Sequence, residues 1–229
     1  MAKAISLADP RVFKAGFAHV RKNDPSLKPI LDALGLIKFR PRGEPFESLV
    51  ESILSQQLAG SAADAIITKV RGLFPAGALE AKRIHLIEGK KLRAAGVSPQ
   101  KLTYLKDLSL RVVEKRLDLE GLSSLSDEEI ISILDEVRGV GPWTVHMFLI
   151  FTLGRPNVLP VDDYGIRTSI QRLYGLEELP KKAAIEKLAE GWHPYATVAS
   201  LYLWHSRDGA PQAKAGKPAG KTREVRKVN

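Results

Sequence analysis

The sequence predicts an all-α protein. Apolar residues recur at the helical i, i+3, i+4 spacing in several segments, and no segment keeps a strict alternation of apolar and polar residues over more than a few positions. Gly, Pro, Ser and Asp separate these segments, as they do between helices of moderate length. The 229 residues, of which 44% are hydrophobic, are enough for one substantial domain or two small lobes sharing a cleft.

Two amphipathic helices are expected in the first third of the chain. The first begins near Phe46 and ends at the polar turn that starts with Ser55. The second begins after Gly60, with Ser61 as its cap, and stops before Pro75, because proline restricts the preceding residue and has no backbone N–H. The residues expected to face inward are Leu49, Val50, Ile53, Leu54, Ile66, Val70 and Leu73.

A capping box and a glycine turn mark the next two helices. Ser126 and Glu129 have the spacing of a capping box, which opens a helix that should end at Gly139. After the turn Gly139-Val-Gly-Pro142, the residues from 143 to 153 are nearly all apolar. This run predicts a helix buried on most sides at the centre of the domain.

The remaining helices are expected between Asp162 and residue 206. Asp162 is a good N-cap for a helix that runs to about Tyr174. Further helices are expected over roughly residues 181–191 and 195–206. We therefore expect a folded domain over residues 1–209, followed by a basic tail over residues 210–229 that has almost nothing to bury.

The chain is basic, with a net charge of +9 and a sequence pI near 9.7, which favours a polyanionic partner. The tail holds about five of these nine charges and is either solubilising or a phosphate-binding arm. The absence of cysteine excludes disulfides, iron–sulfur clusters, thiol nucleophiles and thiolate zinc sites, and no cofactor is expected. No apolar run approaches 18 residues, so no membrane partner is expected.

The stretch Glu136-Val-Arg-Gly-Val-Gly-Pro-Trp-Thr144 carries the first functional signal. Gly139 and Gly141 permit a tight hairpin between two helices, and its outward amides, at the start of the second helix, can bind a phosphate. Short αα-hairpins also use glycine for purely steric reasons. The hairpin alone therefore leaves both interpretations open.

A second motif, Leu159-Pro-Val-Asp-Asp-Tyr-Gly165, follows the buried helix. With the hairpin, it resembles the helix-hairpin-helix DNA glycosylases. The segments 55–59, 192–196 and 201–204 extend the match to the 3-methyladenine DNA glycosylase II (AlkA/Mag) branch in a compact form, over most of residues 45–206. This resemblance implies the HhH-GPD fold, in which two helical lobes flank a cleft that holds the helix-hairpin-helix motif and a catalytic aspartate.

The resemblance also implies residue roles. Asp163 is the implied catalytic carboxylate, because a preorganised negative charge stabilises the oxocarbenium-like sugar of the transition state, whereas Asp162 is expected to cap the helix. Gln57, with Leu58 beside it, is the implied plug that fills the gap left by a flipped base. The implied phosphate-binding hairpin consists of Gly139, Val140, Gly141 and Thr144.

The implied base pocket consists of Trp143, Tyr164, Trp204 and Met147. Aromatic faces hold a cationic alkylated purine by stacking and cation–π attraction, although each of these aromatics could equally be an ordinary core residue. Bifunctional relatives place a lysine at position 143 to cut the strand, which tryptophan cannot do. In this family the hairpin carbonyls, here Arg138 and Val140, can hold a monovalent cation.

We therefore expect a monofunctional DNA glycosylase that hydrolytically excises alkylated purines, of the 3-methyladenine and 7-methylguanine type, from damaged double-stranded DNA. The alternatives are a glycosylase for neutral lesions such as etheno-adenine or hypoxanthine, and a noncatalytic helix-hairpin-helix DNA-binding protein, which would not need Asp163. A monomer is expected, located with the nucleoid in the cytoplasm of a prokaryote or in the nucleus of a eukaryote.

Overall fold

The computed structural model describes residues 5–58 and 60–207, so the basic tail expected at residues 210–229 lies outside the described residues. The all-α prediction is confirmed, since the described residues form helices and turns but no strand. The α-helices are α1 (Pro10–Asn23), α2 (Lys28–Leu34), α3 (Pro45–Ser55), α4 (Gly60–Arg71), α5 (Ala81–Leu86), α6 (Gly89–Ala94), α7 (Pro99–Val113), α8 (Asp127–Asp135), α9 (Pro142–Phe151), α10 (Tyr164–Tyr174), α11 (Lys182–Leu188) and α12 (Ala196–Arg207). Short 3₁₀ turns are η1 (Pro75–Gly77), η2 (Gly121–Ser124) and η3 (Glu190–Trp192).

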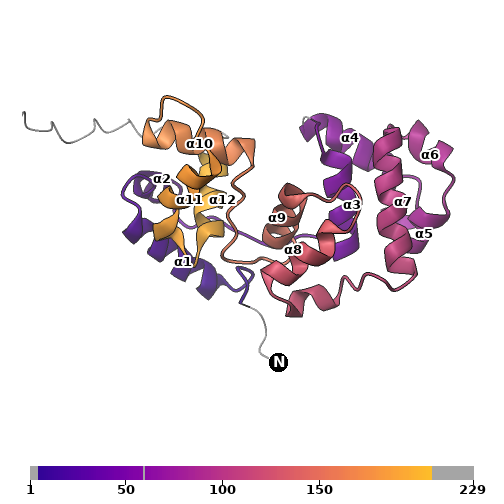
Figure 1. The fold of residues 1–229 in the computed structure, drawn as a ribbon, viewed down its shortest axis with the longest axis horizontal. Helices are drawn as coiled ribbons and strands as arrows, with labels where there is room; N and C mark the ends of the chain where they lie inside the picture. The colour runs from indigo at the N-terminus through magenta and orange to yellow at the C-terminus, as the bar shows by residue number, and fades with distance from the viewer. Residues whose placement is uncertain (1–4, 59, 208–229) are drawn as a thin grey trace, which may run out of the picture.

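The helices form two lobes, as the resemblance implied (Figure 1). The first lobe combines the two ends of the described chain, because α1 and α2 pack with α12, and α12 packs with α10. The second lobe consists of α3 to α9, with α3 packed against α4, α7 and α9. The chain therefore crosses between the lobes twice, once before α3 and once after α9.

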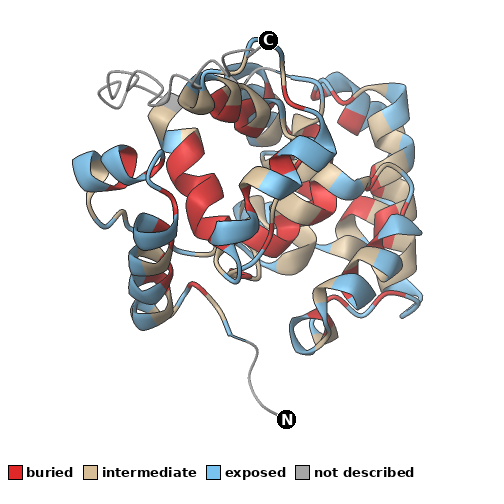
Figure 2. Cartoon of the chain, turned by 60° about the vertical axis from the view of Figure 1, so that its left-hand side comes forward, coloured by how far each residue is buried: buried red, intermediate tan, exposed pale blue. Residues whose placement is uncertain are grey.

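Both lobes contain buried residues (Figure 2). In the second lobe, α9 buries Val145, Phe148, Leu149 and Ile150, which confirms the central helix expected from the apolar run. At ten residues, α9 is too short to cross a bilayer, and no other helix in the described ranges is long and apolar enough to do so.

A buried carboxylate joins the two ends of the chain in the first lobe. Asp24, which follows α1, accepts hydrogen bonds from the Tyr174 hydroxyl at the end of α10 and from Trp192 Nε1 (2.6 Å). The backbone N–H groups of Ser26 and Leu27 donate to its other oxygen. Burial and the hydrogen bond to Asp24 raise the pKa of Tyr174 above its ordinary value. Asp24 therefore has partners for both of its oxygens.

Several details of the helices differ from the sequence predictions. Helix α4 already includes Gly60, so Ser61 lies within the helix, and the helix ends at Arg71. Leu73 consequently lies beyond α4 and is 37% exposed instead of facing inward. The capping box of Ser126 and Glu129 is confirmed by both of its hydrogen bonds. However, α8 ends four residues before Gly139, so a longer turn separates it from α9.

Candidate active site

Asp163 receives hydrogen bonds from three different helices. It is the N-cap of α10, where its Oδ1 accepts from the Ile166 backbone N–H at 2.8 Å. Trp204 Nε1 of α12 donates to the same oxygen at 2.9 Å, and Trp143 Nε1 of α9 donates to Oδ2 at 2.8 Å. The half-buried carboxylate is therefore held in one orientation, and the N-terminus of α10 favours its negative charge.

The adjacent Asp162 does not have the capping role expected for it. The N-cap side chain accepts from the third helical residue, and in α10 this donor, Ile166, bonds to Asp163. Asp162 is exposed, and its negative charge acts on His146 of α9. Burial lowers the pKa of His146, the negative charge of Asp162 partly opposes this shift, and Lys182 adds to it. The capping prediction was therefore wrong by one residue.

The aromatic residues expected at the base pocket are only partly brought together. Trp143 and Trp204 both contact Asp163, whereas Tyr164 begins α10 with 69% of its surface exposed. Met147 lies one turn after Trp143 on α9 and is half-buried against the core. The sequence analysis missed Phe151, whose ring centroid lies 5.5 Å from that of Trp204.

Phe151 belongs to an aromatic row beside the site. Its ring also lies 6.4 Å from that of Phe39, and the Arg42 guanidinium lies 5.4 Å from its centroid. The spacing could have revealed Phe151, because positions 143, 147 and 151 lie one helical turn apart and share a side of α9. The wall next to Trp204 is therefore built from α9 and α12 together.

The two glycines of the hairpin between α8 and α9 differ in backbone conformation and in surroundings. Gly139 has a φ of +80°, and a Cβ added there would lie 2.1 Å from the ring of Tyr104. Gly141 has an extended conformation with a φ of −95°, and a Cβ there would meet nothing within 4 Å. Gly139 is therefore required by the fold, whereas the missing side chain of Gly141 leaves open space in front of the start of α9.

Two of the four expected phosphate-binding residues have other roles in the hairpin. The Val140 amide donates to Val137 O at 3.0 Å, so it is already used within the turn, and the Val140 side chain is buried. The Thr144 side chain is 2% exposed and accepts from Gln56 Nε2 at 3.2 Å. The Val140 amide and these two side chains therefore stabilise the hairpin from inside, and phosphate binding by the four expected residues remains a prediction.

Gln56 is a further residue that the sequence analysis missed. Its side-chain nitrogen donates to Gly139 O at 2.7 Å as well as to Thr144, which links the turn after α3 to the hairpin. Gln57 next to it points away, since it is exposed and has a φ of +56°. Leu58 follows with 39% of its surface exposed. The predicted plug residues therefore lie on a turn that is fixed to the hairpin.

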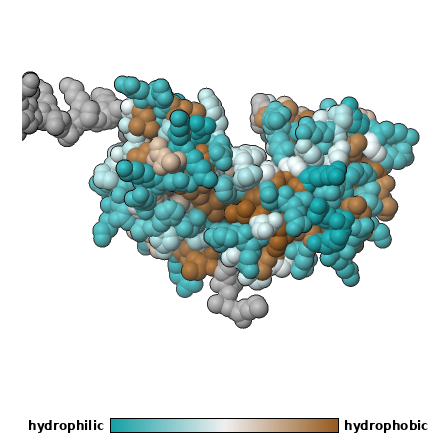
Figure 3. All heavy atoms as spheres, viewed as in Figure 1, coloured by the Kyte–Doolittle hydropathy of each residue, from teal (hydrophilic) through white to brown (hydrophobic). Residues whose placement is uncertain are grey.

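Gln57 and the hairpin border one hollow on the surface. Its volume is about 820 Å³, and its lining includes Gln57, Lys101, Gly141, Trp143 and Asp162. Figure 3 shows that the surface is also hollowed between the two lobes, with apolar atoms at the floor. An extended anionic chain that follows this face would meet the hairpin, the exposed Gln57 and the approach to the carboxylate held by the two tryptophans. The cation expected at the carbonyls of Arg138 and Val140 remains a prediction.

The comparison with known proteins decides the family. A model of HhH-GPD superfamily base excision DNA repair proteins matches residues 50–194, which include the hairpin and Asp163. The chain belongs to this superfamily. Among the HhH-GPD relatives, DNA-3-methyladenine glycosylase 1 of Schizosaccharomyces pombe is 32% identical over 207 residues, which cover 87% of this chain and 90% of the relative.

Solved structures agree with the HhH-GPD assignment. The S. pombe 3-methyladenine DNA glycosylase Mag1 in complex with abasic DNA matches with a TM-score of 0.79 and 31% identity, covering 87% of this chain and 100% of that chain. A DNA-3-methyladenine glycosidase from Bacillus halodurans matches with a TM-score of 0.75 and 33% identity, covering 88% of this chain and 91% of that one. The two-lobed fold is therefore shared along nearly the whole length of both proteins.

Proposed function

We propose that this HhH-GPD protein is a monofunctional DNA glycosylase that excises alkylated purines from duplex DNA. The observation that carries the proposal is the Asp163 carboxylate, which three N–H donors hold at a helix N-terminus between two indole rings. A carboxylate used only as a cap needs one backbone donor. Two further donors from α9 and α12 give a fixed negative charge at the face between the lobes.

The proposed reaction uses this charge in the transition state. As the N-glycosidic bond breaks, positive charge develops on the deoxyribose, and the Asp163 carboxylate stabilises it without having to reorient. The attacking water forms the new bond to the sugar carbon and releases one proton to solvent, and the electrons of the broken bond leave with the base. A base alkylated at a ring nitrogen is already cationic, so it departs as a neutral molecule without a strong general acid.

The indoles give the site its preference for aromatic cations. Trp143 and Trp204 place their indole N–H edges on the carboxylate, and Phe151 extends the aromatic wall beside Trp204. An electron-poor purine stacks well on such rings. Because Trp143 uses its N–H for Asp163 and has no amine, it provides no Schiff base, so the product is an uncut abasic strand.

DNA is held, in this proposal, by the face that carries the hairpin. Phosphate oxygens approach the open space at Gly141 and the N-terminus of α9, and the exposed Gln57 enters the stack when the base is flipped. The similarity to Mag1, which was solved in complex with abasic DNA, supports DNA as the ligand. All the proposed site residues come from one chain, so we propose that a monomer acts on damaged DNA.

Base release under single-turnover conditions tests the proposal. Duplexes carrying 7-methylguanine, 3-methyladenine, etheno-adenine, hypoxanthine or uracil are incubated with excess protein, and released bases and strand breaks are measured separately. We expect release of the two methylated purines and an intact abasic strand until alkali is added. Release of only neutral lesions would assign the site to another substrate class, and DNA binding without any release would support a noncatalytic binding protein.

A further inference from the structure

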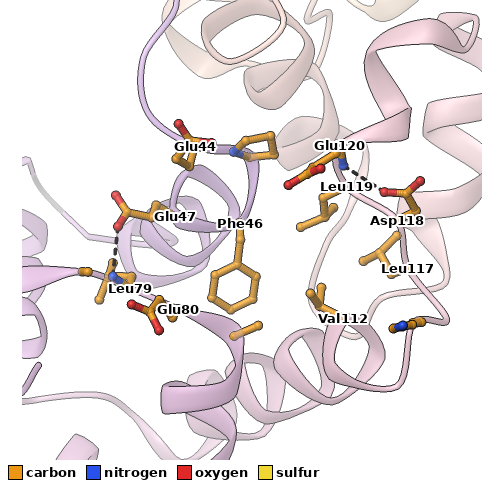
Figure 4. Close-up of a pocket in the computed structure, with 14 residues that line it drawn as sticks. Glu44, Phe46, Glu47, Leu79, Glu80, Val112, Leu117, Asp118, Leu119 and Glu120 are labelled. Carbon is orange, nitrogen blue, oxygen red and sulfur yellow. Dashed lines mark hydrogen bonds between the residues drawn. The ribbon is translucent and has the colours of Figure 1, made fainter.

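A second apolar groove lies on the lobe formed by α3 to α9. It encloses about 760 Å³ and shares no lining residue with the hollow beside the hairpin. The start of α3, the segment before α5 and the loop after α7 form its walls (Figure 4). Its apolar lining includes Phe46, Leu79, Val112, Leu117 and Leu119. The groove is therefore separate from the proposed active site.

Carboxylates surround this apolar floor. Five acidic residues line the groove and only one basic residue, Lys115, although the whole chain has a net charge of +9. Glu47 and Glu80 form ion pairs with arginines. Within the described ranges, the other three acids, Glu44, Asp118 and Glu120, form none. Such a rim repels DNA phosphates and attracts a ligand that combines cations with apolar groups.

The chain itself contains a segment with this chemistry. In Thr222-Arg-Glu-Val-Arg-Lys-Val-Asn229, Val225 and Val228 stand three residues apart among Arg223, Arg226 and Lys227. This segment lies outside the described residues. The 14 residues from 208 to 221 that precede this segment span up to about 46 Å when extended. A compact chain of 229 residues has a radius of gyration of about 17 Å, so this linker is more than twice as long as that radius and can extend from one lobe to the other.

We propose that residues 222–228 dock into this groove of their own molecule. Val225 and Val228 cover the apolar floor at Phe46, and the three cations lie beside the rim carboxylates that form no ion pair in the described ranges. Docking in this way withholds these cations from DNA, because the same charges cannot pair with carboxylates and phosphates together. The proposal does not depend on the reaction catalysed at Asp163.

A spin label on the full-length chain tests the docking. The chain contains no cysteine, so Thr222→Cys provides the only attachment site for a nitroxide. The NMR signals of the backbone amides of residues 78–81 and 117–120 are compared at low salt before and after chemical reduction of the nitroxide. We expect these signals to be lost while the nitroxide is present, and to be recovered largely at about 1 M salt, where charges are screened beyond ~3 Å.

Matched charge reversals test whether the acidic rim of the groove causes this signal loss. Glu44→Lys with Glu120→Lys should abolish the signal loss, whereas Glu177→Lys with Glu178→Lys, which makes the same charge change on exposed residues of the other lobe, should preserve it. Dispersed amide spectra of both variants confirm that they are folded. No loss at the groove in the native sequence, or a loss that survives the rim reversal, would overturn the proposal.

A mixed sample separates docking within one chain from docking between two. Isotope-labelled chains without a nitroxide are combined with unlabelled chains that carry it. Docking within one molecule leaves the signals of the mixed sample intact. Signal loss of equal strength in the mixed sample would contradict the proposal and show that the groove accepts the tail of a second copy.

Discussion

The two hairpin glycines give opposite expectations for the same substitution. Gly139→Ala places a methyl group 2.1 Å from Tyr104 at a backbone φ of +80°. The left-handed conformation costs an alanine about 1–2 kcal/mol, and forcing the ring aside costs roughly 1–3 kcal/mol. We expect the free energy of unfolding to fall by about 2–5 kcal/mol, which lowers the Tm by roughly 4–20 °C.

Gly141→Ala is the matched control for stability. Its extended backbone suits alanine and its Cβ meets no atom, so we expect the free energy of unfolding to be unchanged or raised by about 0.4–1 kcal/mol. The same methyl group occupies the space proposed for a DNA phosphate. Losing a hydrogen bond to a charged group costs about 1.5–3 kcal/mol, so DNA affinity should fall roughly 10- to 150-fold.

Urea unfolding measures the change in stability. A fluorescence titration with a labelled duplex that carries an abasic-site analogue measures the change in DNA affinity. In a Tyr104→Ala background the steric part of the loss is absent. Relative to Tyr104→Ala alone, Gly139→Ala should therefore lower the free energy of unfolding only by the backbone cost of about 1–2 kcal/mol. The reasoning would be refuted if Gly139→Ala were as stable as the native chain. It would also be refuted if Gly141→Ala lost stability without losing DNA affinity.

Three further predictions concern side chains around the site and the first lobe. Trp204→Phe keeps an aromatic side chain but removes a donor to Asp163, so single-turnover base release should slow by roughly 10- to 100-fold; an unchanged rate would exclude a positioning role. Asp24→Ala leaves Tyr174 and Trp192 without their buried acceptor, and urea unfolding should show a loss of about 3 kcal/mol or more, with a loss below 1 kcal/mol speaking against this. Because burial lowers the pKa of His146, the unfolded chain binds a proton at this residue more readily than the folded chain does. The contribution of neutral His146 to the free energy of unfolding is therefore complete above about pH 6.5 and is lost as the pH falls. His146→Gln should reduce the fall in stability that urea unfolding shows between about pH 7.5 and pH 5, and an identical pH profile would contradict the assignment.

Local patterns predicted the helices best where they were strong. The apolar stripe of α3, the capping box at Ser126 and the apolar run of α9 depend on neighbouring residues, and the structure confirms all three. The first helix was readable too, because Asp9 caps α1 and Pro10 begins it, yet the sequence analysis assigned no helix there. Helices α5 and α6 have only six residues each, too few for a periodic signal.

The candidate site could be predicted as a set of residues but not as a geometry. Asp162 and Asp163 are both suitable caps, and only the turn of the chain into α10 decides which carboxylate meets Ile166. Trp143 and Trp204 are 61 positions apart, so their convergence on Asp163 depends on how α9 and α12 pack. Gln56 was overlooked because the polar turn gives no sign of which glutamine faces inward.

Base release by Asp163→Asn tests the central claim most directly. Asparagine is as good an N-cap as aspartate, so the variant should fold and bind DNA with its side-chain oxygen on Ile166 and Trp204, while its amide nitrogen no longer accepts from Trp143 Nε1. Without the negative charge, however, we expect single-turnover release of 7-methylguanine and 3-methyladenine to fall by about 100-fold or more. Release at the native rate by a folded Asp163→Asn protein would contradict the account and place the catalytic group elsewhere.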